Sequence, residues 1–246
     1  MSDAMKEKIS VAMAAFQGEK YISEQIESIL MQLSEDDELI VSYDPSSDNT
    51  LKILRSFENR DRRIRIVLNN DHGVTGNFNN AIMHCSGDYI YISDQDDVWA
   101  PNKVEIIQRY FHDKNVDMVI HNGIHTNENL KVITPPFFEM YRIGNGLLKN
   151  IAKPRYSGCC MAFTRKMKNI ILPIPEIRGY DQWIATVGEI FGIIGYPREI
   201  LLYHRLHGEN VTPLKSRPLP VILHMRFRLI AFLLARCIRE VVHRRV

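Results

Sequence analysis

The sequence predicts an α/β fold: a single domain whose mostly parallel central sheet carries helices on both faces, followed by an amphipathic C-terminal helix. Two observations support this fold. The 246 residues are 45% hydrophobic and 24% charged, which is the balance of an ordinary globular protein. Short apolar runs alternate four times with segments of helical periodicity, and the short connections between them favour parallel strands joined by crossover helices.

The first half of the chain supplies the four strand–helix pairs. Each predicted strand is a short apolar run bounded by turn-forming residues, and these runs cover 9–14, 38–42, 64–68 and 88–93. Apolar residues at spacings of three and four then predict helices over 21–33, 51–57, 78–85 and 101–111. In such sheets ligands bind at the carboxyl ends of the strands, so the turns after these strands are the places to search for a site.

The second half of the chain alternates less regularly. After a strand over 116–121, the segments 123–131 and 135–146 are interpreted as loops or a hairpin. The remaining predicted elements are a strand over 158–164, a helix over 179–191, a strand-like segment over 193–204 and a helix over 217–246.

Cysteine content and charge exclude several classes of protein. The four cysteines are scattered and none lies in a CxxC pair, which argues against a disulfide scaffold or a cysteine zinc site and favours a reducing, cytoplasmic compartment. The net charge of +2 divides into +7 from Lys215 onward and −5 before it, so the body is not expected to bind nucleic acid. The N-terminus lacks a signal-peptide pattern, and the longest apolar run near the end, 229–235, is far shorter than the roughly 20 residues of a membrane span.

An acidic turn follows the fourth predicted strand. Asp94, Asp96 and Asp97 fall within four residues, and three adjacent carboxylates are tolerated most easily when they face solvent or hold a cation. Hard cations such as Mg2+ or Mn2+ take oxygen ligands and often share them with a substrate's phosphates. The alternative is an acidic turn that caps the helix beginning near Pro101, and the turn alone leaves both interpretations open.

The surroundings of this turn resemble glycosyltransferase family 2. The resemblance is carried by GDYIYISDQDDVW at 87–99, ISVAMAAFQG at 9–18 and GNFNNA at 76–81. It is close over 8–112 and returns around 155–212, and SDQDDVW is common in bacterial enzymes that build surface polysaccharides, including rhamnosyl- and hexosyltransferases. The family implies a GT-A-like fold over 8–212, with a nucleotide-sugar-binding half at 8–120 and an acceptor-binding half at 121–212.

The resemblance implies a metal site in the acidic turn. Asp94 and Asp96 match the two acids of the family's DxD motif, in which the second acid touches the metal and the first contacts ribose or sugar. His207, in a segment that resembles the family's YRQHGNNVTG, aligns with a histidine that reaches the metal or the diphosphate. We therefore expect Mg2+ or Mn2+ held by Asp94, Asp96 and His207, while Asp97 contacts the donor sugar or caps the following helix.

The donor-binding residues are also implied by the resemblance. Asp44 matches an acid that reads the base through its N3–H, which favours uracil or thymine over cytosine. The chain departs from the family beside it, where Tyr43 replaces an acid and Pro45 replaces a glycine. The other expected donor contacts are Ala14 beside the base and ribose, Gly73, Gly76 and Asn77 in a turn before a helix, and Arg205 on the diphosphate.

Asp181 is the expected catalytic base. The segment GYDQWI at 179–184 resembles the family's HDWWI, and transfer needs a carboxylate that takes the proton of the attacking acceptor hydroxyl. The alternative role is an acid stabilised at a helix N-terminus. Tyr180 and Trp183 are expected either to stack on a sugar or to belong to the core.

These residues predict an inverting, metal-dependent glycosyltransferase. The donor would be a UDP- or dTDP-sugar, and the acceptor a saccharide or a lipid-linked sugar in bacterial surface polysaccharide synthesis. One alternative is a catalytically impaired family member that only binds the nucleotide sugar, which Tyr43 and Pro45 keep open. The other is a nucleotidyltransferase, although the first turn lacks the basic, glycine-rich signature of that class.

The C-terminal helix carries an apolar stripe opposite its arginines. The stripe consists of Phe227, Ile230, Ala231, Leu234, Cys237, Ile238 and Val241. This pattern favours peripheral attachment to an anionic membrane surface on the cytoplasmic face. The alternatives are a helix docked on the body, or one that pairs two subunits in a homodimer, with its arginines solvated.

Overall fold

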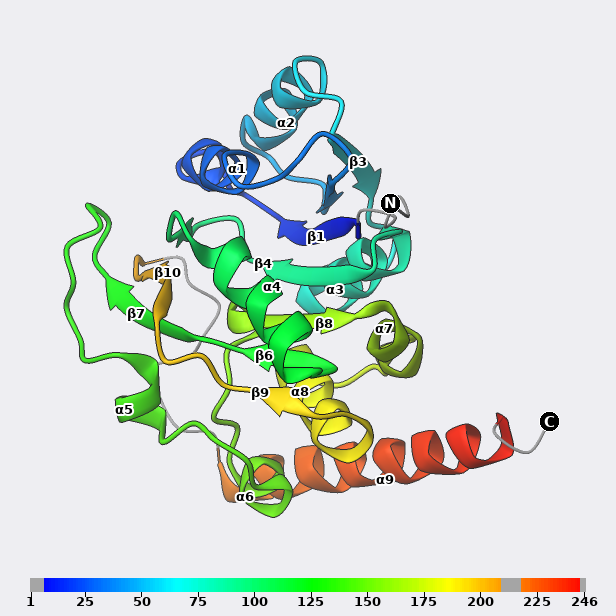
Figure 1. The fold of residues 1–246 in the computed structure, drawn as a ribbon. Helices are drawn as coiled ribbons and strands as arrows, with labels where there is room; N and C mark the ends of the chain where they lie inside the picture. The colour runs from blue at the N-terminus through cyan, green and yellow to red at the C-terminus, as the bar shows by residue number, and fades with distance from the viewer. Residues whose placement is uncertain (1–6, 209–217, 244–246) are drawn as a thin grey trace, which may run out of the picture.

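The computed structural model describes residues 7–208 and 218–243, and it has the predicted architecture. A seven-stranded sheet in the order β3-β2-β1-β4-β8-β6-β9 forms the centre (Figure 1). Only β8 runs antiparallel to its neighbours, so the sheet is mostly parallel. Its strands are β1 Ile9–Ala15, β2 Glu38–Tyr43, β3 Ile64–Leu68, β4 Tyr89–Ser93, β6 Met118–Ile120, β8 Met161–Thr164 and β9 Ile194–Gly195.

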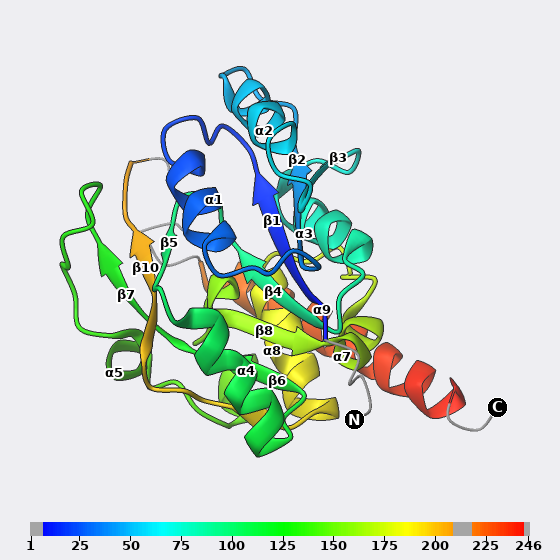
Figure 2. The same cartoon turned by 45° about the horizontal axis from the view of Figure 1, so that its top comes forward.

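Helices cover both faces of this sheet, as predicted. Alternate side chains of β1 divide between two cores, with Val11 and Met13 in one and Ala12 in the other. The first core is covered by α1 Ile22–Leu30, α2 Thr50–Glu58 and α4 Lys103–Lys114 (Figure 2). The second is covered by α3 Gly73–His84, α7 Arg165–Ile171, α8 Tyr180–Phe191 and α9 Leu219–His243.

The segment predicted as loops contains regular structure instead. It holds β7 Asn122–Thr126, α5 Phe137–Tyr141 and α6 Leu147–Ala152. Tertiary contacts explain the difference, because β7 pairs with a strand some 80 residues away and Phe137 is buried against the first core. The strand predicted over 158–164 begins only at Met161, after a 3₁₀ turn over Gly158–Cys160. The helix α7 was not predicted.

A second, three-stranded sheet in the order β5-β10-β7 explains the remaining differences. The segment predicted as one strand-like stretch over 193–204 splits between the sheets, with β9 in the first and β10 Ile200–Arg205 in the second. β5, which is only Val98–Trp99, pairs antiparallel with β10 so that Val98 lies opposite Tyr203. This register brings the residues after Tyr203 beside the acidic turn.

The predicted C-terminal helix is present as α9, docked along the second core. The ends of its predicted range, 217 and 244–246, lie outside the described residues, as do residues 209–212 of the segment that contains His207. No helix in the described ranges is long and apolar enough to cross a membrane.

Glu38 joins the first strands at the edge opposite the acidic turn and supports a stability prediction. Its carboxylate accepts hydrogen bonds from Ser10 Oγ (2.6 Å), Ser86 N (2.6 Å) and Lys8 Nζ (3.0 Å). Burial opposes ionisation, but these hydrogen bonds outweigh it and lower the pKa of Glu38 from 4.5 to about 2.

Because this pKa is lower in the folded chain, ionised Glu38 stabilises the fold above pH 4.5, and that contribution is lost as the pH falls toward 2. We expect Glu38→Gln to lower the free energy of unfolding near neutral pH by up to roughly 3 kcal/mol, with the difference from wild type vanishing in acid. Urea unfolding across this pH range measures it, with the exposed Glu35→Gln as control. A difference that persists unchanged into acid would contradict the assignment.

Candidate active site

The acidic turn lies where three elements meet. It follows β4, and the antiparallel pairing of β4 with β8 places the turn over Gly158–Cys160 at the same edge of the sheet. β10 then brings His204 alongside. One ligand atom from each of Asp94, Asp97, Cys159 and His204 lies within 4.8 Å of the others. Four groups that can bind a cation therefore converge at the carboxyl end of β4.

Asp97 and His204 form a buried ion pair within this cluster. Asp97 is fully buried, with its Oδ1 2.8 Å from Nδ1 of His204. Burial opposes the charge on both groups, yet their mutual attraction lowers the pKa of Asp97 and raises that of His204 well above its usual value. Asp97 Oδ1 also accepts from the Arg205 backbone N–H at 3.2 Å. Asp97 thus contacts β10, not the start of the following helix.

Burial and neighbouring carboxylates disfavour the ionised forms of Asp94 and Asp96. Burial, with the neighbouring carboxylates of Asp97 and Asp96, raises the pKa of Asp94 to about 8. Burial and Asp97 likewise raise the pKa of Asp96. Lys103 lies behind the cluster and donates to the Cys159 carbonyl at 3.2 Å, but burial lowers the pKa of its amine to about 8. A hard divalent cation would supply positive charge that stabilises both carboxylates in their ionised forms, so these residues fit a metal site.

His207 and Asp96, two of the three predicted metal ligands, are in direct contact. The Nε2 of His207 lies 2.9 Å from Oδ2 of Asp96, and its ring lies against that of Tyr21, with 4.9 Å between centroids. The structure therefore brings a residue of the last described loop to the acidic turn, more than 100 residues away in the chain.

Arg205 is almost fully buried and connects three segments. Its guanidinium donates to the Asp96 carbonyl (3.0 Å), the Glu128 carbonyl (2.5 Å) and the Glu24 carboxylate (2.5 Å), and it lies over the ring of Tyr21. These contacts hold α1 and the acidic turn together. Its expected contact with the diphosphate stays a prediction.

The expected donor residues form a second cluster at the ends of β1 and β2. Asp44 is buried; its Oδ2 accepts from Gly73 N at 2.7 Å, and its Oδ1 lies 3.0 Å from Nδ1 of His72. Asn77 donates to the Ala15 carbonyl at 3.2 Å, while its own Oδ1 is buried without a partner among the described residues. Ala14 lies near the end of β1, and Gly73, Gly76 and Asn77 lie in the first turns of α3, not in a turn before that helix as predicted.

The departures from the family pattern have a local structural role. The backbone N–H of Ser46 donates to the hydroxyl of Tyr43 at 2.8 Å, and Ser46 Oγ donates to the Asp44 carbonyl at 2.9 Å. Tyr43 therefore stabilises the turn that Pro45 shapes, with Asp44 at its base.

Gln95 is a site residue that the sequence analysis missed. Its side-chain amide accepts from Phe16 N at 2.8 Å and donates to the Phe16 carbonyl at 2.6 Å, which joins the end of β1 to the acidic turn. A Cβ at Gly18 would lie 2.3 Å from Oε1 of Gln95, so this contact requires glycine. Cys159 and Lys103 were missed as well. Gln95 lies within SDQDDVW, but the string does not reveal its contact with Phe16, and Cys159 and Lys103 belong to no motif that signals their position.

Asp181 lies in the first turn of α8, after Gly179, whose φ of +96° favours glycine. Its Oδ1 accepts from Gln182 N at 2.8 Å. The preceding Tyr180 stacks on Phe78, and its pKa is raised well above the usual value by burial and then by Asp94 and Asp181. A Cβ at Gly158 would lie 2.2 Å from the Tyr180 hydroxyl, so the start of α8 packs against the 3₁₀ turn that lies beside the acidic turn.

Tyr180 and Trp183 belong to the core, so the alternative of a sugar-stacking wall is wrong for the described structure. Both are buried, and Trp183 donates from Nε1 to the Ile171 carbonyl at 2.9 Å.

Comparison with known proteins assigns the chain to a family. The sequence model of the family described as "Glycosyl transferase family 2" matches residues 10–170, well over half of the chain. The chain belongs to glycosyl transferase family 2. Within that family it is 35% identical over 184 residues to an Escherichia coli UDP-Glc:alpha-D-GlcNAc-diphosphoundecaprenol beta-1,3-glucosyltransferase, covering 73% of this chain and 69% of that protein.

Solved structures show the GT-A-like fold of this family 2 chain. S. aureus TarS 1–349 in complex with UDP-GlcNAc has a TM-score of 0.72 at 17% identity, covering 91% of this chain and 66% of its own. Glucosyl-3-phosphoglycerate synthase from Mycobacterium tuberculosis, with Mn2+, UDP and glucosyl-3-phosphoglycerate, has a TM-score of 0.58 at 20% identity, covering 94% and 80%. The chain spans between 42% and 69% of the length of the first three curated relatives that it matches.

Proposed function

We propose that this family 2 protein is an inverting, metal-dependent glycosyltransferase that uses a UDP- or dTDP-sugar. The observation that carries the proposal is the convergence of three groups at one edge of a GT-A-like sheet. These groups are the Asp44 cluster for the nucleotide, the acidic turn with His207 for a cation, and Asp181 at the start of α8. Each supplies one requirement of sugar transfer.

The residues have separate tasks in this mechanism. Asp44 accepts the N3–H of the base in place of its contact with His72 or with the Gly73 backbone N–H. The first turns of α3, from Gly73 to Asn77, lie against the donor. Asp181 takes the proton of the acceptor hydroxyl as its oxygen attacks the anomeric carbon opposite the departing diphosphate. Asp94, Asp96 and His207 would hold Mg2+ or Mn2+, which when bound neutralises the charge that develops on the diphosphate. Holding both substrates in line supplies much of the remaining rate.

The names of related proteins support the choice of substrates. UDP or a UDP-sugar is bound in the two solved structures above, one of which also contains Mn2+. The Escherichia coli relative is named for a sugar acceptor on diphosphoundecaprenol, as is a Campylobacter jejuni protein 36% identical over 92 residues. We therefore propose a lipid-linked acceptor, a role in bacterial surface polysaccharide synthesis and a cytoplasmic location at the membrane. A screen of nucleoside-diphosphate sugars would show whether the transferred sugar is rhamnose or another hexose.

Asp44 provides a test of base selection. We expect Asp44→Asn to weaken UDP binding roughly 10- to 100-fold, because the buried acceptor of the N3–H becomes an amide that also presents donors. CDP, which lacks that N–H, should lose much less affinity. Calorimetric titration of both nucleotides measures this, with Asp71→Asn, an exposed acid of the neighbouring turn, as control. Equal losses for UDP and CDP would show that Asp44 does not read the base.

The two alternative functions differ in their products. A nucleotidyltransferase releases pyrophosphate, whereas a glycosyltransferase releases a nucleoside diphosphate, and a binding-only protein releases neither. A screen of nucleoside-diphosphate sugars with Mn2+ that follows release of nucleoside diphosphate therefore tests the proposed reaction. A parallel screen of nucleoside triphosphates with sugar 1-phosphates, which follows pyrophosphate, tests the nucleotidyltransferase alternative.

A further inference from the structure

The arginines of α9 face the body of the protein. Leu229 and Leu233 are buried in the second core, and the guanidinium of Arg236 lies over the ring of Trp183. The arginines donate mainly to backbone carbonyls: Arg236 to those of Ile170, Leu172 and Pro173, Arg239 to those of Leu172 and Asn169, and Arg228 to that of Glu176. The helix is therefore docked on the body, as one of the alternatives considered from the sequence held. Of its arginines, Arg236 is buried, whereas Arg228 and Arg239 are partly exposed.

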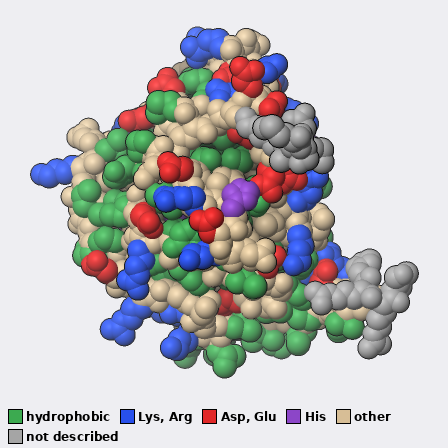
Figure 3. Space-filling view, viewed as in Figure 1, with side chains coloured by type: hydrophobic (Ala, Val, Ile, Leu, Met, Phe, Trp, Pro, Cys, Tyr) green, Lys and Arg blue, Asp and Glu red, His purple; other side chains and the backbone are tan. Residues whose placement is uncertain are grey.

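The opposite face of α9 is apolar and exposed. Eight large apolar side chains there are between 41% and 71% exposed: Leu219, Leu223, Phe227, Ile230, Leu234, Ile238, Val241 and Val242. None of the exposed side chains described for α9 is Lys, Arg, Asp or Glu. Figure 3 shows apolar side chains gathered along the lower edge of the molecule, where α9 lies in Figure 1. At about 1.5 Å per residue the face is roughly 37 Å long. A contiguous apolar face of this length differs from the single, scattered apolar side chains of an ordinary protein surface.

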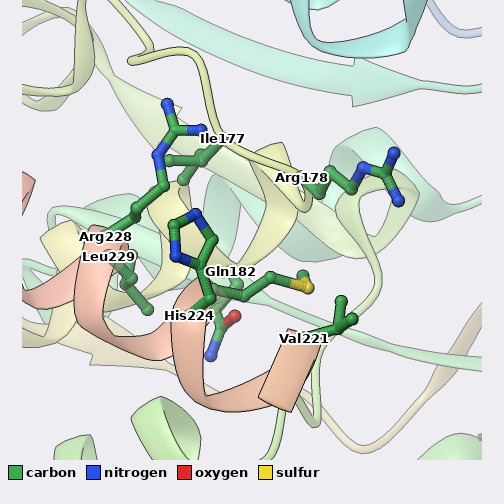
Figure 4. A pocket seen from close by; sticks show the side chains of 8 residues that line it. Ile177, Arg178, Gln182, Val221, His224, Arg228 and Leu229 are labelled. Atoms are coloured by element: carbon green, nitrogen blue, oxygen red, sulfur yellow. The ribbon is translucent and has the colours of Figure 1, made fainter. Parts of the chain in front are cut away.

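A basic pocket adjoins the first turns of this face. It has a volume of about 370 Å³ and lies between α9 and the loop before α8 (Figure 4). Val221, seven residues before Arg228 and on the same side of the helix, lines the pocket, while Arg178, His224 and Arg228 supply its basic lining. None of the eight lining residues is acidic. This lining suits the phosphate of a lipid headgroup.

The charge of the chain distinguishes a membrane from a second copy. The segment from Lys215 onward carries +7, so two such segments placed side by side would repel one another. An anionic bilayer attracts the basic residues that line the adjoining pocket, at about 1 kcal/mol for each basic residue near its surface. A helix with an outward apolar face also fits the plane of a bilayer interface, where that face is buried among the acyl chains.

We propose that the exposed apolar face of α9 is a docking surface for an anionic lipid bilayer, with the basic pocket receiving a lipid phosphate. Gln182, next to Asp181, accepts a hydrogen bond from Arg226 of α9 at 2.6 Å. The bilayer therefore lies beside the element that carries the proposed base. Docking itself needs neither nucleotide nor metal, so its test is independent of the proposed function.

The experiment is flotation of the full chain with vesicles of phosphatidylcholine, alone or mixed with phosphatidylglycerol, without nucleotide or metal. We expect binding to the anionic vesicles. Replacing Phe227, Leu234 and Ile238 together with serine should lower the partition coefficient roughly 100-fold. The control replaces Met31, Leu68 and Ile193 with serine; these are 57–78% exposed elsewhere and should leave binding unchanged. Circular dichroism and thermal unfolding show that each variant is folded.

The pocket is tested separately. Arg178→Gln should reduce binding to anionic vesicles about fivefold, while Lys52→Gln, an exposed cation on α2, should not. Failure of the wild-type chain to float, or full binding by the triple-serine variant of α9, would overturn the proposal. Light scattering provides a third outcome: a wild-type dimer that the triple variant converts to a monomer, without vesicle binding, would assign the face to a second copy and also overturn it.

Discussion

Replacing Asp181 with asparagine is expected to lower the rate of sugar transfer by roughly 10²- to 10⁴-fold, with little change in donor affinity. Asp181 lies in the first turn of α8, after Gly179, and the preceding Tyr180 packs against Gly158 beside the acidic turn. The amide of asparagine has the same shape as the carboxylate but cannot take a proton from the acceptor hydroxyl. The loss should therefore fall on kcat.

A transfer assay with separate titration of UDP measures both parts of this prediction. The matched control is Glu176→Gln, which changes an exposed acid in the loop just before α8. It should retain transfer. Wild-type rates from the Asp181→Asn protein would reject Asp181 as the base and leave it the helix-terminal role that its sequence position also allows.

The second large effect is expected at the acidic turn. Asp96→Asn should abolish detectable Mn2+ binding in the presence of UDP and lower transfer at least ~100-fold, because an amide is a weaker ligand for a hard cation than a carboxylate. Asp96 has the clearest place in the site, since it contacts His207 and lies beside Asp94 and the buried Asp97–His204 pair. Removing the metal with a chelator should produce the same loss in the wild-type protein.

Calorimetric titration of Mn2+ into the UDP complex provides the measurement, and Asp36→Asn, an exposed acid away from the sheet edge, provides the control. If the Asp96→Asn protein binds Mn2+ as tightly as the wild type, the cation is held elsewhere. In that case the cluster of Asp94, Asp97, Cys159 and His204 would be the next set of ligands to test.

The sequence predicted the first half of the fold well because local signals determine it. The runs over 9–14, 38–42 and 64–68 are apolar, short and bounded by turns, and each lies in the sheet with nearly the expected limits. The second half depends on distant contacts. β5 has two residues, and β7 becomes a strand only because β10 returns beside it, so neither has a local pattern that could reveal it.

The candidate site divides in the same way. Asp94, Asp96 and His207 could be named because a motif carries them, and the structure places His207 against Asp96. The roles of Cys159 and Gln95 could not be predicted. Cys159 reaches the site through the antiparallel pairing of β8 with β4, and Gln95 acts through hydrogen bonds to the backbone of Phe16. The roles of Trp183 and Arg205 follow from their burial, which the sequence does not reveal because it depends on which elements pack together.

The way α9 is attached bears on how this protein could evolve. Its arginines donate hydrogen bonds to main-chain carbonyls of residues 169–176, and every amino acid has such a carbonyl. Substitutions of the exposed side chains in that stretch would keep these hydrogen bonds, whereas Ile170, Ile171 and Ile174 pack in the same core as α9. The exposed part of the loop leading to Asp181 can therefore vary in sequence while α9 keeps its position on the body.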